Sequence, residues 1–319
     1  MYKHAAAIGA DIGRVAIKTA VVRLDGDVIC EYNVPLSKKQ TRDYIISELI
    51  KSVTKIRQIV ASNGVNPIAI GISAKGFIDH EKGLILGPDQ GIKDWKNVSL
   101  ARIVNHDTGL PVFVGNDANL MTIAEHRFGV ANGYENVIFV ALRTGIGGGI
   151  IINGKLYRGV NNAGGEIGQM IINYSGRQSK TGIRGSFEHY ASASALVRRY
   201  IEEKKPAVKK SAVYTARDIF KLGYDNDATA LKVIRENANL VGIGIANLIT
   251  IFAPQIIVLG GGMSQARDSY LKMIRKSAMS NSLENCRAEV KIERAALGSE
   301  AALIGAAYYS LTRLAGRNI

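Results

Sequence analysis

A polar cluster follows an apolar stretch that is predicted to be a buried strand. Residues 110–115 form this stretch, and Asn116-Asp117-Ala118-Asn119 comes directly after it, ahead of a predicted helix over 120–128. The carboxyl end of a buried strand is where α/β folds place their chemistry. Asp117 also fits a helix N-cap, and the two interpretations are compatible. Because the cluster is denser than one cap requires, Asp117 is a candidate catalytic residue.

A Gly-rich turn joins two apolar runs further along the chain. Residues 137–142 and 150–152 are predicted strands, and the stretch between them contains Gly145, Gly147, Gly148 and Gly149. Glycines let backbone N–H groups point into one concavity without a Cβ to block a ligand, which suits a nucleotide phosphate. An ordinary tight hairpin with glycines at positive φ fits the same residues. The stretch alone leaves both interpretations open.

Two further units repeat the design of a strand followed by a glycine turn. In residues 5–26, Asp11 lies where the first strand ends, next to Gly13, and residues 255–264 run into Gly260-Gly261-Gly262. Apolar spacing predicts the other elements: helices over 41–62, 187–201, 228–253 and 299–314, and strands over 67–73 and 289–293. Strands that alternate with helices favour an α/β fold.

The composition predicts a soluble globular protein of one or two domains. The chain has 319 residues, of which 47% are hydrophobic and 21% charged. No apolar run is long enough to span a membrane, and the N-terminus lacks the order of a signal peptide. The two cysteines, Cys30 and Cys286, fit reduced thiols in a cytoplasmic protein.

The net charge of +14 is compatible with binding nucleic acid or phosphorylated metabolites. The basic residues are mostly scattered, and the densest run, over 198–210, contains two glutamates and is broken by Pro206. We interpret this run as a solvated helix end and linker, so we expect no nucleic-acid partner.

The order of the motifs resembles the ROK family (repressors, open reading frames, kinases) of the actin-like, sugar-kinase and Hsp70 ATPase superfamily. The resemblance covers essentially the whole chain and rests on five motifs in order: Asp11-Ile-Gly13, Asn116-Asp-Ala-Asn119, Thr144-Gly-Ile-Gly-Gly-Gly149, Gly165-Glu-Ile-Gly168 and Ile257-Val-Leu-Gly-Gly-Gly262. It implies a two-lobed actin-like ATPase (ribonuclease H-like) fold, with mixed sheets flanked by helices and a cleft between the lobes. We expect residues 1–118 and 297–319 to form a smaller N-terminal lobe, and residues 119–296 to form a larger lobe that carries the oligomer contacts.

The resemblance implies ATP-dependent phosphorylation of a hexose, such as glucose or an N-acylated hexosamine. Asp117 matches the general base that takes the proton of the sugar hydroxyl. The positions that match sugar-binding residues are Asn116, Glu166, Gln169 and Glu188. The positions that match the sites for ATP and Mg²⁺ are Asp11, Gly13, Thr144, Gly145, Gly147, Gly148, Gly260, Gly261 and Gly262. Among these, Asp11 matches the carboxylate that faces the Mg²⁺-phosphate.

The sequence departs from the family pattern in both phosphate turns. The usual Asp-Ile-Gly-Gly-Thr is Asp11-Ile-Gly-Arg14-Val15 here, and the usual Gly-Thr-Gly is Arg143-Thr-Gly145. Three interpretations of the two arginines are open. Their side chains fill the nucleotide pocket, bind phosphate as bidentate donors, or point to solvent.

The sequence also departs from the family's zinc site. Gln169, Ser179, Thr181 and Ser186 stand where the family has one histidine and three cysteines. Because neutral amide and hydroxyl groups do not hold Zn²⁺, we expect no zinc.

Two alternatives to a kinase are weighed. A non-catalytic sugar-binding sensor or pseudokinase, without a DNA-binding domain of its own, rests on Arg14, Val15, Arg143 and the lost zinc ligands. A repressor would carry a helix-turn-helix ahead of the first strand, which begins by about Ala5, so we do not favour it. We expect a cytoplasmic homodimer whose partner is a small-molecule sugar, with no membrane contact.

Overall fold

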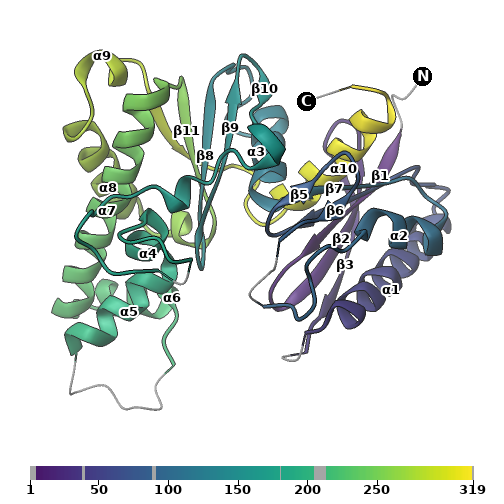
Figure 1. Cartoon of the computed structure of the whole chain (residues 1–319), viewed down its shortest axis with the longest axis horizontal. Coiled ribbons are helices and arrows are strands. Elements are labelled where there is room, and N and C mark those ends of the chain that lie inside the picture. Colours follow the sequence, from purple (N-terminus) through teal and green to yellow (C-terminus); the bar gives the residue numbers. More distant parts are fainter. Residues whose placement is uncertain (1–4, 38–39, 88–90, 180, 205–212, 318–319) are drawn as a thin grey trace. The chain divides into compact units, whose positions relative to one another are not determined.

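The protein folds as two compact units of mixed α/β structure, each with its own sheet. A computed structural model describes residues 5–37, 40–87, 91–179, 181–204 and 213–317 (Figure 1). The first unit comprises residues 1–133, 150–164 and 296–319, and the second comprises residues 134–149 and 165–295. The lobes expected from the sequence divide the chain differently, because they assign residues 119–133, 150–164 and Ala296 to the second part.

The sheet of the first unit combines an antiparallel and a parallel half. Its order is β3–β2–β1–β4–β7, in which β1, β2 and β3 are antiparallel while β1, β4 and β7 are parallel. The strands are β1 (Ala6–Ile12), β2 (Ala16–Arg23), β3 (Val28–Pro35), β4 (Ile70–Ala74) and β7 (Val112–Asn116). A second, two-stranded sheet joins β5 (Ile78–Asp79) and β6 (Leu84–Ile85). The strands predicted over 5–26, 67–73 and 110–115 are confirmed.

Helices cover both faces of this sheet (Figure 1). Helices α1 (Arg42–Ala61) and α2 (Leu100–Thr108) lie on one face, and α10 (Ala301–Leu314) lies on the other, packed against α3 (Asp117–Phe128). The helix predicted over 41–62 is confirmed as α1, and the Thr41 side chain caps its start by accepting the N–H of Tyr44. Its apolar side chains and those of the sheet form the core of the unit. The short 3₁₀ helix η1 (Val160–Asn162) also belongs to this unit.

Helix α10 lies directly on the backbone of the sheet, since glycines remove the side chains between them. A Cβ at Gly9 on β1 would overlap the carbonyl oxygen of Leu303, and one at Gly71 on β4 would overlap that of Ala306. A Cβ at Gly305 would likewise overlap the carbonyl oxygen of Leu120 on α3. These contacts fix β1, β4 and α3 against one helix, and therefore fix the ends of those strands.

A buried carboxylate joins α3 to the segment that leads into α10. Glu125 is fully buried, and its Oε2 accepts the N–H groups of Val130 and Ala296 at 3.1 Å each. Its Oε1 accepts the N–H of Leu297 at 2.8 Å. Three backbone donors stabilise the carboxylate in a place where it would otherwise be costly to bury.

The second unit supplies most of the other five-stranded sheet, whose order is β10–β9–β8–β11–β12, with β8, β11 and β12 parallel. The strands of this sheet are β8 (Val137–Leu142), β9 (Ile146–Ile152), β10 (Lys155–Leu156), β11 (Ile256–Gly260) and β12 (Lys291–Arg294). Residues 150–152 of β9 and all of β10 are counted in the first unit. The helices of the second unit are α4 (Phe187–Ala191), α5 (Ala193–Lys204), α6 (Ala216–Tyr224), α7 (Ala228–Phe252), α8 (Asp268–Ser280) and α9 (Glu284–Arg287), with 3₁₀ helices η2 (Ile167–Gln169) and η3 (Gly262–Gln265).

The prediction of one continuous helix over 187–201 was wrong, because the segment forms two helices, α4 and α5. Ser192 separates α4 from α5 with an extended backbone (φ −70°, ψ 169°), and its Oγ accepts the N–H of Ala195 at 3.3 Å. A serine that bonds to the backbone three residues on favours the start of a new helix. The long helix before Pro254 and the terminal helix are confirmed as α7 and α10.

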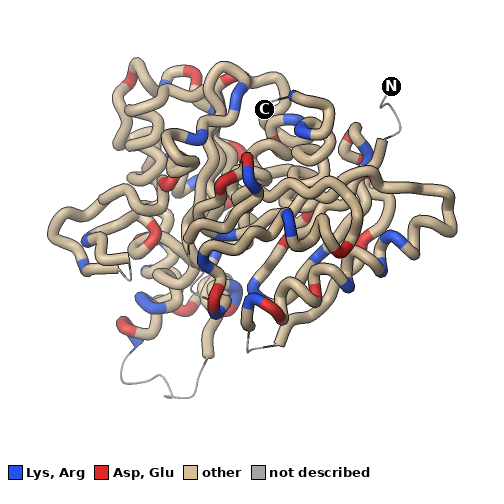
Figure 2. Tube along the Cα trace, turned by 45° about the vertical axis from the view of Figure 1, so that its right-hand side comes forward, with Lys and Arg blue, Asp and Glu red and all other residues tan. Residues whose placement is uncertain are grey.

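Charged residues of both signs are interspersed along the trace in Figure 2. Helix α5 ends at Lys204, and the rest of the basic run over 198–210 lies outside the described residues. Cys30 and Cys286 are both free thiols. Among the helices that the structure describes, none is both long and apolar enough to cross a membrane.

The close contact between Gly71 and α10 predicts that a larger residue at position 71 lowers the free energy of unfolding. In Gly71→Ala, the new methyl group has to displace the backbone of α10, so we expect a loss of about 1–3 kcal/mol and a melting temperature lower by roughly 2–4 °C per kcal/mol. Gly262→Ala is the matched control, because its Cβ would meet no atom within 4 Å. Thermal unfolding followed by circular dichroism measures both variants. Equal melting temperatures for the two variants would contradict the proposed close packing.

Candidate functional site

The first unit gathers polar side chains at the carboxyl ends of three adjacent parallel strands. Asp11 on β1 is paired in register with Ser73 on β4, and Ser73 with Gly115 on β7, directly before Asn116-Asp117. Ser73 Oγ donates a hydrogen bond to Asp11 Oδ1 at 2.7 Å. Neighbouring strands lie about 4.8 Å apart, so Asp11 and the polar cluster share one edge of the sheet, two strands apart.

Asn116, rather than Asp117, is the N-cap of α3. Its Oδ1 accepts the N–H groups of Ala118 at 3.0 Å and Asn119 at 3.2 Å, and its Nδ2 donates to the carbonyl oxygen of Gly76 at 3.2 Å. The capping interpretation of Asp117 was therefore wrong by one residue. Asp117 is the first residue of the helix, half-buried, with Oδ1 also 3.0 Å from the N–H of Ala118. Carboxylates are stabilised in this first helical turn.

The Gly-rich stretch of the second unit is mostly strand rather than turn. Gly147, Gly148 and Gly149 lie within β9, only Gly145 lies in the turn, and none of these four glycines has a positive φ. The interpretation of this stretch as a tight hairpin that needs glycines at positive φ was therefore wrong. Packing explains Gly148, because a Cβ there would overlap the side chain of Ile167.

The carboxylate of Glu188 lies against this turn. Glu188, in the first turn of α4, accepts the N–H of Ile146 with Oε2 at 2.9 Å, and a Cβ at Gly145 would overlap the same oxygen. On its other side the turn is held by the start of α5. The N–H of Ala193 donates to the carbonyl oxygen of Arg143 at 3.0 Å, and that of Ser194 to Thr144 at 3.3 Å. The predicted phosphate turn and one predicted sugar-binding residue thus belong to one local structure.

The two unusual arginines differ in their surroundings. Arg14 is exposed, as is Val15 with 76% exposure, and the carbonyl oxygen of Arg14 accepts a hydrogen bond from Gln40 Nε2 at 2.7 Å. Arg143 is half-buried, and its Cγ would be 2.7 Å from a Cβ at Gly261, a residue that requires glycine at φ +86°. The Arg143 side chain therefore lies over the turn at Gly260-Gly261-Gly262, which is among the positions predicted to bind ATP.

Hydrogen bonds link three of the four residues that stand at the family's zinc-ligand positions. Thr181 Oγ1 donates to Gln169 Oε1 at 3.1 Å and lies 2.7 Å from Ser179 Oγ. Ser186 Oγ is buried and has no hydrogen-bond partner among the described residues. The described part of the chain contains no group of three or more His, Cys, Asp or Glu side chains that could hold a metal ion.

The remaining predicted residues fall into the two units separately. Gly13 is in the first unit with Asp11, Asn116 and Asp117, and a Cβ there would be 2.8 Å from the carbonyl oxygen of Ala16. The second unit contains the other predicted sugar-binding and nucleotide-binding residues: Thr144, Gly145, Gly147, Gly148, Glu166, Gln169, Glu188, Gly260, Gly261 and Gly262. Glu166 is exposed, directly before η2.

Sequence reasoning missed two contributors to these sites. Ser73 could have been found, since it ends an apolar strand in the same way as Asp11 does. The backbone N–H groups of Ala193 and Ser194 gave no signal, because the break that exposes them lies inside a helical pattern.

The bond between Glu188 and the turn is testable by amide exchange. In Glu188→Ala, the Ile146 N–H loses a charged acceptor worth about 1.5–3 kcal/mol, so we expect its exchange to become roughly 10- to 100-fold faster. Glu188→Gln is the matched control, since its amide oxygen still accepts a hydrogen bond. Nuclear magnetic resonance measures the exchange rate of the Ile146 N–H in each variant. An unchanged rate in Glu188→Ala would argue against the hydrogen bond between Ile146 and Glu188.

Known proteins resemble this chain along nearly its whole length. A glucokinase of Halalkalibacterium halodurans is 32% identical over 307 residues, which are 93% of this chain and 92% of that protein. A xylose repressor of Bacillus spizizenii is 30% identical over 301 residues, which are 93% of this chain and 75% of the repressor.

Solved structures share the fold as well. The crystal structure of a ROK family glucokinase from Streptomyces griseus, in complex with glucose and AMPPNP, superimposes with a TM-score of 0.83 at 32% identity. The match covers 96% of this chain and 99% of the glucokinase. A profile of the ROK family matches residues 7–313. The predicted fold class and family are thereby confirmed: this chain belongs to the ROK family.

Proposed function

We propose that this protein transfers the γ-phosphoryl group of ATP to a hydroxyl group of a hexose, with glucose or an N-acylated hexosamine as the substrate. The observation that carries the proposal is the edge of the first sheet, where Asp11, Ser73 and the Asn116-Asp117 pair lie on three neighbouring strands. The likeness to two glucokinases supports the same reaction.

Asp117 is the proposed general base. A hydroxyl oxygen that attacks the γ-phosphorus gives up its proton, and a positioned carboxylate accepts that proton as the new P–O bond forms and the bond to the β-phosphate oxygen breaks. Asp117 is suited to this role because Asn116 caps the helix in its place, so the Asp117 carboxylate is not needed as the N-cap. The amide group of Asn116 is bonded to Gly76, which fixes the start of α3.

Asp11 is the proposed residue for Mg²⁺. Its Oδ1 accepts a hydrogen bond from Ser73, while its Oδ2 has no hydrogen-bond partner in the part of the chain that the structure describes. An oxygen ligand on a fixed strand end fits a hard cation that retains most of its waters. When bound, Mg²⁺ neutralises charge on the phosphate oxygens.

Glu188 is proposed to bind the sugar while it holds the turn. Its Oε2 accepts the N–H of Ile146, and Oε1 keeps its lone pairs for a sugar hydroxyl. Sugar and nucleotide would then be positioned by the same short segment. Asn116, Glu166 and Gln169 are proposed to supply further polar contacts to the sugar, and the turns at Gly145 and Gly261 to receive the nucleotide.

The alternative is a non-catalytic sugar-binding sensor. The observation that favours it is the Arg143 side chain, which lies over Gly261 and so occupies part of the predicted nucleotide site. We propose instead that the Arg143 guanidinium binds a nucleotide phosphate, because a half-buried arginine makes strong bidentate bonds to phosphate. No zinc and no nucleic acid take part in the proposed function.

Replacing the base tests the kinase proposal. Asp117→Asn keeps the shape of the side chain but accepts no proton, so we expect kcat to fall by about 10²- to 10⁴-fold in a coupled ATP-to-ADP assay over hexoses and aminosugars. Sugar binding, measured by calorimetry, is expected to persist. Asp107→Asn, an exposed acid of the same unit, serves as control. If Asp117→Asn and wild type turn over every sugar equally, Asp117 is not the base.

Replacing Arg143 separates the two functions. If its guanidinium binds phosphate, Arg143→Ala loses a charged hydrogen bond, and we expect ATP to bind roughly 10- to 100-fold more weakly by calorimetry. Arg14→Ala is the matched control, because Arg14 is exposed. Tighter ATP binding in Arg143→Ala would mean that the arginine blocks the pocket and would favour the sensor.

A further inference from the structure

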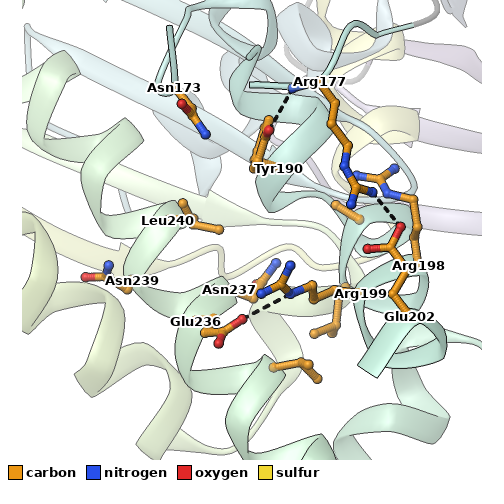
Figure 3. A pocket seen from close by; sticks show the side chains of 13 residues that line it. Asn173, Arg177, Tyr190, Arg198, Arg199, Glu202, Glu236, Asn237, Asn239 and Leu240 are labelled. Atoms are coloured by element: carbon orange, nitrogen blue, oxygen red, sulfur yellow. Dashed lines mark hydrogen bonds and ion pairs between the residues drawn. The ribbon is translucent and has the colours of Figure 1, made fainter. Parts of the chain in front are cut away.

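The second unit contains a cavity that none of the predicted site residues lines. It has a volume of ≈ 470 Å³ and lies among α4, α5, α7 and the loop that contains Asn173 and Arg177 (Figure 3). Its size falls within the range of small-molecule sites. No residue predicted to bind sugar, nucleotide or magnesium is among those that line it.

Positive charge exceeds negative charge in the wall of this cavity. Three arginines face two glutamates, and two of the arginines are paired. Arg177 Nη1 lies 2.5 Å from Glu202 Oε1, and Arg199 Nε lies 3.3 Å from Glu236 Oε2. These pairs leave the third arginine, Arg198, as the excess charge.

Arg198 has no carboxylate of its own. One of its terminal nitrogens donates to the carbonyl oxygen of His189, and it makes no ion pair within the described ranges of the chain. Arg198 is half-buried, and burial lowers the pKa of its guanidinium; the negative charge of Glu202 opposes this shift, and the positive charge of Arg177 adds to it to a smaller extent. Figure 3 shows the Arg177 and Arg198 side chains approaching each other beside Glu202. Two guanidinium groups thus share one carboxylate, and a second anion would relieve their repulsion.

The rest of the wall suits a small ligand with hydroxyl groups. Tyr190 accepts the backbone N–H of Arg177 at 2.8 Å, so its own O–H remains a donor, and Asn173 Oδ1 accepts a hydrogen bond from Ser175, which leaves its Nδ2 group available. Leu196 and Leu240 add apolar surface. Convergent polar groups beside some apolar surface are typical of metabolite sites.

We propose that this cavity binds a small anionic metabolite of sugar size, with its phosphate or carboxylate on Arg198 and Arg177 and its hydroxyl groups on Asn173 and Tyr190. The site is separate from the predicted sugar site but rests on the same helices. Helix α4 also carries Glu188, and the first residues of α5 hold the carbonyl groups of Arg143 and Thr144.

Calorimetry on the whole chain tests the site with ribose 5-phosphate, ribonate and the neutral control ribose. We expect at least one anion to bind and ribose not to bind; ribose 5-phosphate alone would assign a phosphate ligand, and ribonate alone a carboxylate. Because Arg198 supplies the unpaired charge, Arg198→Ala is expected to weaken binding at least tenfold. Arg235→Ala, an exposed arginine on α7, is the matched control and is expected to bind as the wild type does.

A second variant guards against misfolding of Arg198→Ala. Leu240→Trp fills the cavity and leaves every arginine in place, so it is also expected to weaken binding at least tenfold, with folding checked by thermal melting. The proposal is overturned if neither anion binds at millimolar concentration, or if ribose binds equally well. It is equally overturned if Arg198→Ala and Arg235→Ala weaken binding of the anion to the same extent. The same holds if Leu240→Trp is folded and binds the anion as tightly as the wild type does.

Discussion

The second unit is organised around the contact of the Glu188 carboxylate with the turn at Gly145. The carboxylate reaches the N–H of Ile146 only because Gly145 has no Cβ in the way. Its own position is set by Phe187, which is fully buried and lies where a Cβ at Gly244 on α7 would be 2.5 Å from its ring. The longest helix therefore fixes α4, α4 fixes the carboxylate, and the carboxylate fixes the turn. The position of a sugar bound to Glu188 would therefore depend on the packing of α4 against α7.

In the first unit the corresponding constraint is the absence of side chains under α10. Gly9 and Gly71 let the helix rest on the backbone of β1 and β4, and Glu125 fastens α3 to the segment before α10. Strand ends held in this way cannot shift independently, so Asp11 and Asp117 keep a constant spacing. A constant spacing is what the proposed roles of Asp117 as general base and Asp11 as magnesium ligand would require.

The sequence predicted helices and strands well where their residue pattern is local and long. It predicted them less well where contacts between distant residues determine where an element begins or ends. The apolar repeats of α1 and α7 are written into neighbouring residues, and both helices are confirmed. The break at Ser192 was missed because the apolar spacing continues across it. The glycines of β9 were assigned to a turn, although Gly148 is small because Ile167, distant in sequence, packs there. The order of motifs identified the family. Ser73 could have been noticed at the end of a predicted strand, but its contact with Asp11 could not, because pairing between strands is not written in either strand alone.

The departures from the family pattern have physical counterparts in the structure. Hydrogen bonds join Gln169, Ser179 and Thr181, which stand at three of the positions that match the family's zinc ligands, and the Arg143 side chain lies over Gly261. The central claim remains that the chain phosphorylates a hexose, and ³¹P nuclear magnetic resonance of wild-type protein with ATP, Mg²⁺ and a panel of hexoses and N-acylhexosamines tests it most directly. The account predicts a sugar-phosphate signal that grows as the γ-phosphate signal of ATP declines, for at least one sugar. No such signal for any sugar, with sugar binding intact by calorimetry, would contradict it.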